Sequence, residues 1–398
     1  MSWEKVRLGD VTDSCLGKML DQEKNKGEYQ PYLANLNVRW GTFDLDNLSQ
    51  MRFEYDEQER YGLRYGDLVV CEGGEPGRCA IWKDQIPGMK IQKALHRVRV
   101  HRCLDYRYLF YWFLLAGKRG ILEQYFTGAT IKHLPGQKLK SVVIDMPPIE
   151  TQHRIADILS TYDDLIENNR KQTKLLEETA QRLYKEWFVD LRFPGYEHTK
   201  ITDGVPEGWE KSTVATVSSI LRRGISPRYN ENGKFVVINQ KCIRQTVVSF
   251  DESRQQEKPY PEDLNLQDSD TVICSTGAGT LGRVGQIFGN YPDTTLDSHV
   301  TLVRAKEGFG KQYLFQSLNS RQTYLMGMGK GSTNQLELNR GTIQDLDIYI
   351  PSKKVLNQFE QVAQPIHDKI SVISKCIMQL QTARDCLLPK LMSGKVEV

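Results

Sequence analysis

Two glycine-rich stretches have residue types and spacing that could bind a nucleotide. Residues 277–282 (GAGTLG) have the G-x-G-x-x-G spacing of a dinucleotide-binding turn and follow a predicted strand. Such a turn opens a helix whose N-terminus faces the pyrophosphate, whereas residues 283–288 (RVGQIF) alternate like a strand. Residues 327–332 (GMGKGS) lack the G-x-x-x-x-G-K-[ST] spacing of a phosphate-binding loop. We therefore interpret both stretches as polar loops and expect no nucleotide site.

The histidines and cysteines do not form a catalytic or metal-binding pattern. His96 and His299 precede strands at what look like matching positions, but neither has a Ser, Cys or carboxylate motif nearby, so we expect framework roles. Cys71 and Cys274 close matching apolar runs and are expected in the core. The eight cysteines never form C-x-x-C, which argues against zinc and disulfide frameworks and favours a reducing compartment. We expect no catalytic residue, metal or cofactor in this chain.

Basic and polar side chains suited to DNA remain as candidates. Lys and Arg can neutralise phosphates, and Asn and Gln can pair with adenine edges. The net charge of +3, from 53 basic and 50 acidic residues, permits such patches without requiring them. For each candidate the alternative interpretation is a solvated surface side chain. The candidates are Lys18, Arg39, Trp40, Arg78, Thr130, Lys132, Arg222, Arg223, Lys241, Arg244, Arg283, Lys330, Thr333, Asn334 and Gln335.

The elements that must position these side chains occur twice. Short β-like runs and one apolar helical candidate, residues 106–122, fill the chain to about Pro148, and a turn-rich linker at 199–208 precedes a second copy. The residues at 3–5, 67–71 and 128–130 recur at 209–211, 270–274 and 331–333, at offsets between 203 and 206. Residues 12–66 and 218–269 hardly resemble each other. A shared scaffold with divergent segments suits two lobes that bind different things.

Each copy ends in a helix with a coiled-coil seam. Apolar or small residues step by four and three, and ten seam positions match at an offset of 204. We expect the two helices to pack antiparallel, with Ile155 near Leu391, as a rod of roughly 50 Å. Pro365 is expected to break or kink the second helix near Gln364. The expected pairing residues are Ile155, Leu159, Tyr162, Ile166, Leu176, Leu183, Trp187, Phe359, Ile366, Ile370, Ile373, Ile377, Leu380, Leu387 and Leu391.

Several motifs together resemble one known family. They are the helix opening PPIETQHRIADIL, its end LYKEWF, the entry GVPEGW to the second copy, and the closing LLPKLMSG. In this order they resemble the specificity subunit of type I DNA restriction-modification enzymes, over essentially the whole chain. The resemblance implies an α+β fold with two target recognition domains of mixed sheet and helices, separated by two long antiparallel helices with a pseudo-two-fold repeat. The expected boundaries are 1–148 and 209–351 for the domains, 149–193 and 352–398 for the helices, and 194–208 for the linker.

The resemblance also implies a function and partners. The chain would recognise a bipartite, asymmetric target in double-stranded DNA without catalysing a reaction. Two modification (methyltransferase) subunits would dock on its helices and carry S-adenosylmethionine, and ATP-dependent restriction (nuclease) subunits are further expected partners. The N-terminus is charged and no apolar run approaches a membrane span, so we expect a cytoplasmic protein. The alternative functions are a tandem protein-interaction scaffold and a self-sufficient DNA enzyme. The sequence has neither an N/D-P-P-Y/F methyltransferase tetrapeptide nor a Walker lysine, which argues against the enzyme.

Overall fold

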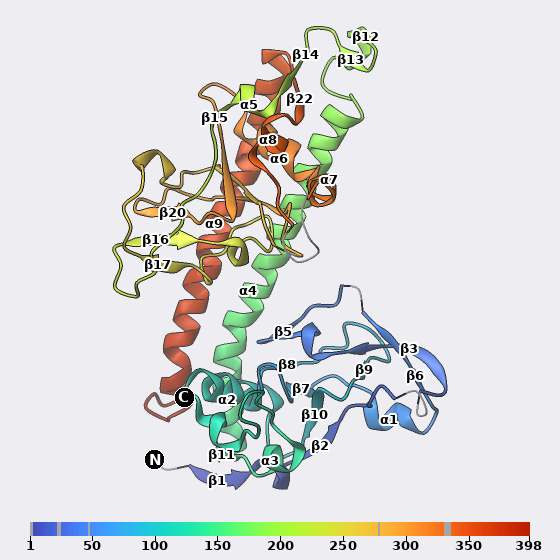
Figure 1. Ribbon diagram of the computed structural model, residues 1–398. Helices are drawn as coiled ribbons and strands as arrows, with labels where there is room; N and C mark the ends of the chain where they lie inside the picture. Colours follow the sequence, from blue (N-terminus) through green and yellow to red (C-terminus); the bar gives the residue numbers. More distant parts are fainter. Residues whose placement is uncertain (1–2, 22–24, 47, 278, 330–335) are drawn as a thin grey trace. The chain divides into compact units, whose positions relative to one another are not determined.

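The computed structural model describes residues 3–21, 25–46, 48–277, 279–329 and 336–398, which form two compact units. Unit 1 comprises residues 1–167 and 378–398, and unit 2 comprises residues 168–377. The sheets of unit 1 have the strand orders β1-β11, β2-β10-β7-β8, β6-β3-β9 and β4-β5 (Figure 1). Their bounds are β1 (Glu4–Arg7), β2 (Thr12–Leu16), β3 (Glu28–Leu33), β4 (Val38–Arg39), β5 (Thr42–Phe43), β6 (Gln50–Phe53), β7 (Leu68–Cys71), β8 (Cys79–Ile81), β9 (Lys90–Ile91), β10 (Leu95–Val100) and β11 (Val143–Met146).

Unit 2 repeats these sheets with new strands. The orders β14-β22, β15-β21-β18-β19 and β17-β16-β20 correspond to the first three orders of unit 1. A small hairpin, β12 (Ile201–Thr202) with β13 (Val205–Pro206), lies in the expected linker. The other bounds are β14 (Glu210–Thr213), β15 (Ser218–Arg223), β16 (Phe235–Ile238), β17 (Arg254–Gln256), β18 (Thr271–Cys274), β19 (Val284–Gln286), β20 (Thr294–Leu296), β21 (Val300–Ala305) and β22 (Asp347–Ile350).

The shorter helices also correspond between the units. In unit 1 they are α1 (Glu57–Tyr61), α2 (Tyr106–Lys118) and α3 (Gly136–Lys140), and in unit 2 they are α5 (Val214–Val217), α6 (Lys311–Asn319), α7 (Gln322–Gly327) and α8 (Arg340–Gln344). Tyr108 of α2 and Tyr313 of α6 each donate a hydroxyl hydrogen bond to a backbone carbonyl, of Asp145 and Tyr349 respectively. Both helices bury most of their side chains in the core of their unit. The duplication expected from the sequence is therefore a duplication of structure.

Strand register fixes which residues are equivalent and corrects one expected match. Cys71 pairs with Leu95 and Cys274 pairs with Val300, so the two cysteines are equivalent, as expected, and both are buried. By the same register His96 corresponds to Thr301, and His299 lies before the strand, so the expected match of the two histidines is wrong. The His96 imidazole is 1% exposed and lies 2.8 Å from the Leu134 carbonyl, whereas His299 is exposed. Burial lowers the pKa of His96, as suits a neutral framework residue.

Each unit contains the same buried ion pair. Asp67 precedes β7 and accepts two hydrogen bonds from Arg99, at 2.8 and 2.7 Å. Asp270 precedes β18 and accepts two from Arg304, both at 2.7 Å. Both aspartates are nearly fully buried. The two parallel hydrogen bonds of such a pair hold the end of the strand in one geometry. Removal of the arginine would leave a buried carboxylate without a partner, which would lower the stability of the unit.

Two long helices each contribute residues to both units. The first, α4 (Ile149–Tyr184), continues as a π-helical turn at Lys185–Val189, and the second is α9 (Lys353–Leu391). The expected break at Pro365 is wrong, since α9 runs through it without interruption. Pro365 and Gln361 are both exposed. Water can therefore take up the Gln361 carbonyl that the missing proline N–H leaves without a partner.

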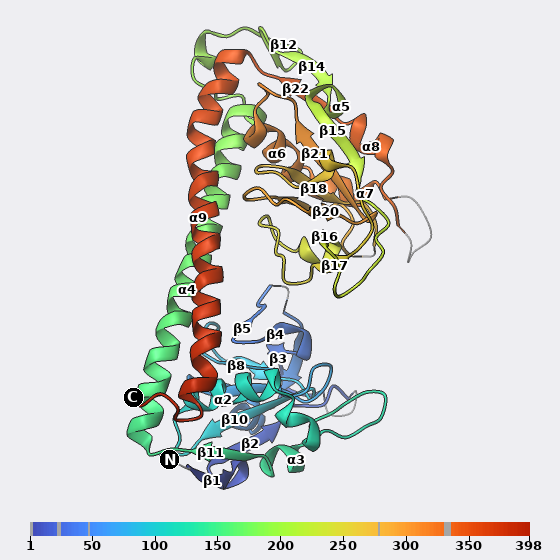
Figure 2. The same cartoon turned by 90° about the vertical axis from the view of Figure 1, so that its left-hand side faces the viewer.

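The helices pack antiparallel in each unit, as expected (Figure 2). In unit 1 the start of α4 meets the end of α9, with Ile155 and Leu159 in one buried cluster with Leu388 and Leu391. Arg384 of α9 donates a hydrogen bond of 2.5 Å to Asp163 of α4, and Tyr111 of α2 donates one of 2.7 Å to the same carboxylate. Hydrophobic contact and charge therefore both fix this end of the seam.

In unit 2 the end of α4 meets the start of α9 through aromatic rings. Phe359 is fully buried, and its ring centroid lies 4.9 Å from that of Phe188 and 5.8 Å from that of Trp187. Tyr184 and Tyr313 complete the cluster. Nearer the middle of α4, the Asn169 amide lies 3.6 Å from the Cys376 sulfur. None of the expected pairing residues is exposed, and Ile155, Leu159, Phe359 and Leu391 lie in the buried clusters of the two units.

Glu177 of α4 gives the helix pairing of unit 2 a dependence on pH. Burial, with a smaller effect of Glu178, raises the pKa of Glu177 to about 7. Because the folded pKa lies above the ordinary value of 4.5, stability is lost as the pH rises from that value through about 7. We expect Glu177→Gln to raise the free energy of unfolding by about 1–2 kcal/mol at pH 8 and hardly at all at pH 4. Urea denaturation at both pH values measures this, and an equal gain at both would contradict it.

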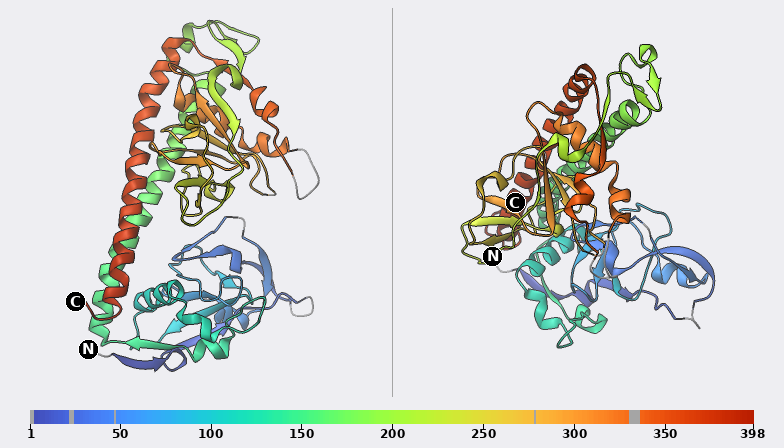
Figure 3. Two further views of the ribbon diagram at one scale, coloured as in Figure 1. Left: turned by 60° about the vertical axis from the view of Figure 1, so that its left-hand side comes forward. Right: turned by 45° about the horizontal axis from the view of Figure 1, so that its top comes forward.

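The two ends of the chain lie close together in unit 1 (Figure 3). Trp3 and Val398 both pack against the core cluster that contains Leu391. Beside them, a pocket of about 950 Å³ is lined by the first strand, the start of α4 and the final residues. No helix in the described part of the chain has the length and apolarity needed to cross a membrane.

Candidate nucleic-acid interface

In unit 1, three segments distant in sequence form one surface, which we call the unit 1 edge: residues 34–44, 72–78 and 127–134. The turn at Gly73-Gly74 lies between a short 3-10 helix, Asn35–Asn37, and the loop that ends at His133. The Asn35 amide donates to the Gly73 carbonyl, and Gly73 and His133 form a β-bridge. Thr127 and His133 exchange two backbone hydrogen bonds of 2.8 Å, which close the loop. The loop, the glycine turn and the 3-10 helix therefore lie side by side at the ends of the strands.

Arg78 lies at the centre of the unit 1 edge and is neutralised there. Its guanidinium donates to Glu75 at 2.9 Å and to the Asn35 side-chain oxygen at 2.7 Å. The other Glu75 oxygen accepts a hydrogen bond of 2.7 Å from the Trp40 indole. Arg78 is therefore bound on two sides, and its side chain is only 16% exposed. Its main contribution is to hold the glycine turn against the 3-10 helix.

The remaining unit 1 candidates differ in accessibility. Lys18 is 2% exposed, and its ammonium is taken up by Glu57 and the Arg52 carbonyl, so it belongs to the interior and we leave it out of the interface. The Arg39 side chain is 46% exposed and has a distant ion pair with Asp44 at 3.8 Å. Lys132 is exposed, 3.7 Å from Glu123, and Thr130 is exposed in the same loop. Arg39, Lys132 and Thr130 are thus accessible from solvent.

Unit 2 forms the equivalent surface, the unit 2 edge: residues 239–244, 275–277, 279–283, 323–329 and 336–338. The turn that begins at Gly277 is not followed by a helix, as expected from the sequence; it leads into β19 instead. Gly277, Gly279 and Gly282 have positive φ, which glycine adopts without strain. Gln240, the equivalent of Asn35, accepts a hydrogen bond of 3.2 Å from Thr280. Thr276 forms a β-bridge with Glu337, as Gly73 does with His133.

The arginines of the two edges are equivalent in position but not in environment. Arg39 donates to the Leu36 carbonyl at 2.7 Å, and Arg244 donates to the carbonyl of the equivalent Lys241 at 3.2 Å. The backbone carbonyl of Arg78 accepts from Cys71, and that of Arg283 accepts from Cys274. However, the unit 2 turn contains no counterpart of Glu75. Within the described parts of the chain, neither the Arg283 guanidinium nor the Lys241 ammonium has an ion pair or hydrogen bond.

The other unit 2 candidates are held by acidic or backbone groups. Arg222 donates to Asp263 at 2.8 Å, and Arg223 pairs with Glu337 at 2.5 Å and donates to the Leu338 carbonyl. Arg244 is 59% exposed, with Glu252 at 3.8 Å. Lys330, Thr333, Asn334 and Gln335 lie outside the described residues. Unit 2 therefore offers three cations at its edge: Lys241 and Arg244, which are exposed, and Arg283, which is partly exposed.

Sequence reasoning missed the paired amides Asn35 and Gln240. Each is the first residue of the same 3-10 helix, Asn35–Asn37 or Gln240–Cys242, and each contacts the glycine turn. An offset of 205 aligns them, but the divergent residues around them gave no signal. Among the described residues, no group of three or more His, Cys, Asp or Glu side chains could hold a metal ion.

Comparison with known proteins decides the family. A family model described as the type I restriction modification DNA specificity domain matches residues 1–178 and again residues 206–379. The chain belongs to the type I restriction-modification specificity family. Each match contains one of the two edges. The role of the chain is therefore DNA sequence specificity rather than catalysis, within a complex that includes DNA and other subunits.

Individual relatives agree with this assignment. The type I restriction enzyme MjaIX specificity subunit of Methanocaldococcus jannaschii is 29% identical over 73% of this chain and 69% of its own length. The MjaVIII specificity subunit of the same organism is 24% identical over 100% of this chain and 93% of its own length. The fold is similar to that of the crystallised S subunit from M. genitalium, with a TM-score of 0.56, 17% identity, and coverage of 98% and 96% of the two chains. Nothing in these comparisons supports the alternative of a protein-interaction scaffold.

Proposed function

We propose that each edge reads one half of a bipartite, asymmetric DNA target. The observation that supports this most is the pair Arg39 and Arg244. They occupy equivalent positions after the same 3-10 helix, both are exposed, and they lie in segments of otherwise unlike sequence. A common frame with unlike neighbours is what two readers of different half-sites need, because phosphate contacts fix register and base contacts give specificity. The target is then asymmetric because the two edges differ.

The two edges would contribute differently to DNA affinity and to discrimination between sequences. The unit 2 edge has the cations Lys241, Arg244 and Arg283, so much of its affinity would come from phosphate contacts and counterion release. The unit 1 edge has Asp44 3.8 Å from Arg39 and Glu75 2.9 Å from Arg78, which neutralises that guanidinium. A carboxylate there can accept from cytosine N4 and repels phosphate, so unit 1 would contribute more to discrimination than to affinity.

Partners are part of the same proposal. Two modification subunits would dock on the exposed faces of α4 and α9 and supply S-adenosylmethionine and the methyl transfer, and ATP-dependent nuclease subunits would complete the complex in the cytoplasm. The exposed apolar residues Leu165 and Leu175 of α4 and Val372 and Met378 of α9 provide apolar surface for such contacts.

Methylome sequencing tests the function. Cells with this chain are expected to show one bipartite adenine motif that disappears when the chain is deleted and returns when it is supplied again. An unchanged methylome in the presence of active modification subunits would refute the proposal.

A further inference from the structure

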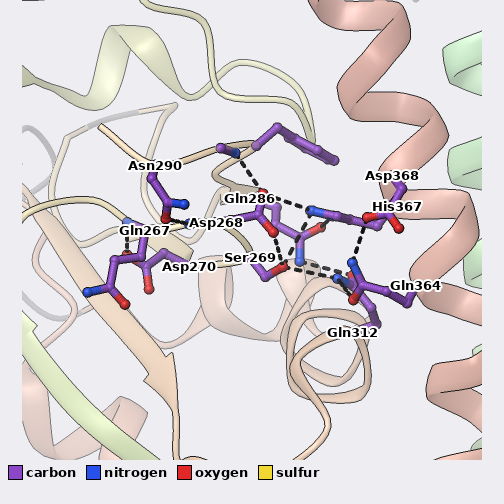
Figure 4. A network of polar contacts seen from close by, with 12 residues as sticks. Gln267, Asp268, Ser269, Asp270, Gln286, Asn290, Gln312, Gln364, His367 and Asp368 are labelled. Atoms are coloured by element: carbon purple, nitrogen blue, oxygen red, sulfur yellow. Dashed lines mark hydrogen bonds and ion pairs between the residues drawn. The ribbon is translucent and has the colours of Figure 1, made fainter. Parts of the chain in front are cut away.

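A buried polar network joins α9 to the strand that leads from the unit 2 edge (Figure 4). His367 of α9 is 3% exposed, and its ring stacks on Phe288 at 4.4 Å and 16°. Its Nδ1 lies 3.1 Å from Gln286 Oε1, and its Nε2 lies 3.3 Å from Asp268 Oδ1 and 3.4 Å from Ser269 Oγ. Both ring nitrogens therefore face oxygen atoms; the imidazole itself is 2% exposed and the Asp268 side chain is 34% exposed.

The direction of the hydrogen bonds in this network is fixed by carboxylates. Asp368 can only accept, so Gln364 donates its Nε2 to it at 2.8 Å and offers its oxygen to Gln312 Nε2 at 3.2 Å. Gln312 Oε1 then accepts from Gln286 Nε2 at 3.1 Å. The remaining Gln286 atom, Oε1, is an acceptor and faces His367 Nδ1. The imidazole must donate there.

The other ring nitrogen faces the Asp268 carboxylate. Asp268 is a carboxylate and can only accept, and the Ser269 hydroxyl donates to its Oδ2 at 3.0 Å. The Gly289 N–H also donates to Asp268 Oδ1 at 2.7 Å, so this carboxylate is held in place as an acceptor. The Ser269 hydroxyl lies nearer to Asp268 Oδ2, at 3.0 Å, than to Nε2, at 3.4 Å, and with its proton on Asp268 an imidazole that donates from both nitrogens, an imidazolium, completes the network.

The backbone at Ser269 adopts a conformation that its counterpart in unit 1 meets with a glycine. Ser269 has φ +68°, a left-handed conformation that is costly for a residue with a side chain, whereas the equivalent Gly66 of unit 1 has φ +88°. Unit 2 thus replaces a suitable glycine with a strained serine. The serine hydroxyl accepts from Gln312 at 3.3 Å as well as bonding Asp268. Unit 1 has Ile81 where unit 2 has Gln286, so it lacks the acceptor that faces the imidazole.

The network reaches the unit 2 edge through Gln286. Gln286 is the last residue of β19, three residues after Arg283. Its backbone N–H donates to the Thr246 carbonyl at 2.7 Å, and its carbonyl accepts from Val248 at 3.4 Å. These bonds hold the segment that contains Lys241 and Arg244. We propose that His367 is a positioning residue for the unit 2 edge, and that it holds Gln286 and Asp268 in place only while the imidazole is protonated on both nitrogens.

Other titratable groups surround the imidazole, and their own titration must be separated from that of His367. Asp368 and Glu360 lie on α9, and burial raises the pKa of Glu360. Lys311 of α6 lies beside Glu360 and Asp270. Glu177 of α4 lines the same small pocket as His367, and its own pKa is about 7. Because Glu177 also titrates near pH 7, His367→Gln is compared with the histidine chain in a Glu177→Gln background, where the two proteins differ in the imidazole alone.

The test rests on the proposed function and uses the full chain with a labelled duplex carrying its methylome-defined motif. We expect the preference for this duplex, over one with the unit 2 half-site altered, to fall about five- to tenfold between pH 6 and pH 8.5. In the Glu177→Gln background, His367→Gln should make the preference independent of pH. Asp268→Asn removes the charge that favours the imidazolium and should move the midpoint to lower pH. The matched control His101→Gln, an exposed histidine 3.3 Å from Asp13 in unit 1, should keep the original profile.

The outcomes separate the two proposals. If the unsubstituted chain shows no preference at any pH, the proposed function fails. If it shows a preference and His367→Gln keeps the original pH profile, or Asp268→Asn leaves the midpoint in place, only the role of His367 is refuted. Amide hydrogen exchange of residues 240–248 in the unsubstituted chain is a second measurement that needs no variant. After correction for intrinsic rates it should be faster at pH 8.5 than at pH 6, and equal rates would count against the proposal.

Discussion

Phe359→Ala is expected to lower the free energy of unfolding of unit 2 by about 3–5 kcal/mol. The side chain, on α9, is fully buried among Tyr184 of α4, Trp187 and Phe188 of the π-helical turn that continues α4, and Tyr313 of α6. Its removal leaves a cavity among rigid rings and deletes several edge-on ring contacts. Chemical denaturation, followed by the fluorescence of Trp187 and Trp209 in unit 2, measures the loss.

Val362→Ala is the matched control for this prediction. Val362 lies on the same helix, three residues away, but is 46% exposed. Its truncation should change the free energy of unfolding by less than about 0.5 kcal/mol. A Phe359→Ala effect no larger than that of Val362→Ala would show that the seam does not stabilise unit 2.

Arg283→Ala is expected to weaken DNA binding about tenfold and to reduce the salt dependence of log K by about one phosphate contact. The reason is that the Arg283 guanidinium has no carboxylate partner in the described part of the chain, so its charge is available to DNA. Arg78→Ala, the equivalent change in unit 1, should alter the salt slope little, because Glu75 already neutralises that guanidinium. Fluorescence anisotropy with the cognate duplex at several salt concentrations gives both quantities.

Glu75→Gln completes this comparison. It removes the carboxylate from Arg78 while the amide oxygen can still accept from the Trp40 indole. We expect binding to strengthen about threefold at low salt and the salt slope to increase. Equal salt slopes for Arg283→Ala and Arg78→Ala would contradict the different electrostatics proposed for the two edges.

Local periodicity made much of the fold predictable. The strands at Leu68–Cys71, Leu95–Val100 and Thr271–Cys274, the helix Tyr106–Lys118 and both seams follow from patterns that each segment carries by itself. A seam residue such as Ile155 is identified by its spacing, because one face of a helix must be buried whatever its partner is. Because the chain is duplicated, the elements identified in one copy also predicted those of the other.

The candidate site was less predictable because it depends on contacts between distant segments. Nothing near Lys18 in the sequence indicates that Glu57 will bury it, and nothing near Arg78 indicates that Asn35 will bind it. The histidine mismatch has the same origin, since a loop of different length shifts His299 by two positions relative to His96. Pro365 was misjudged because the exposure of its carbonyl partner decides whether a helix tolerates proline.

An exchange of one domain tests most directly whether the two edges read independent half-sites. Residues 209–351 would be replaced by the corresponding segment of the MjaVIII relative, which this chain matches over its full length, and the methylated motif would be read by methylome sequencing. We predict that one half of the motif changes while the other half is retained. A motif altered in both halves, or in neither, would contradict independent reading by the two edges.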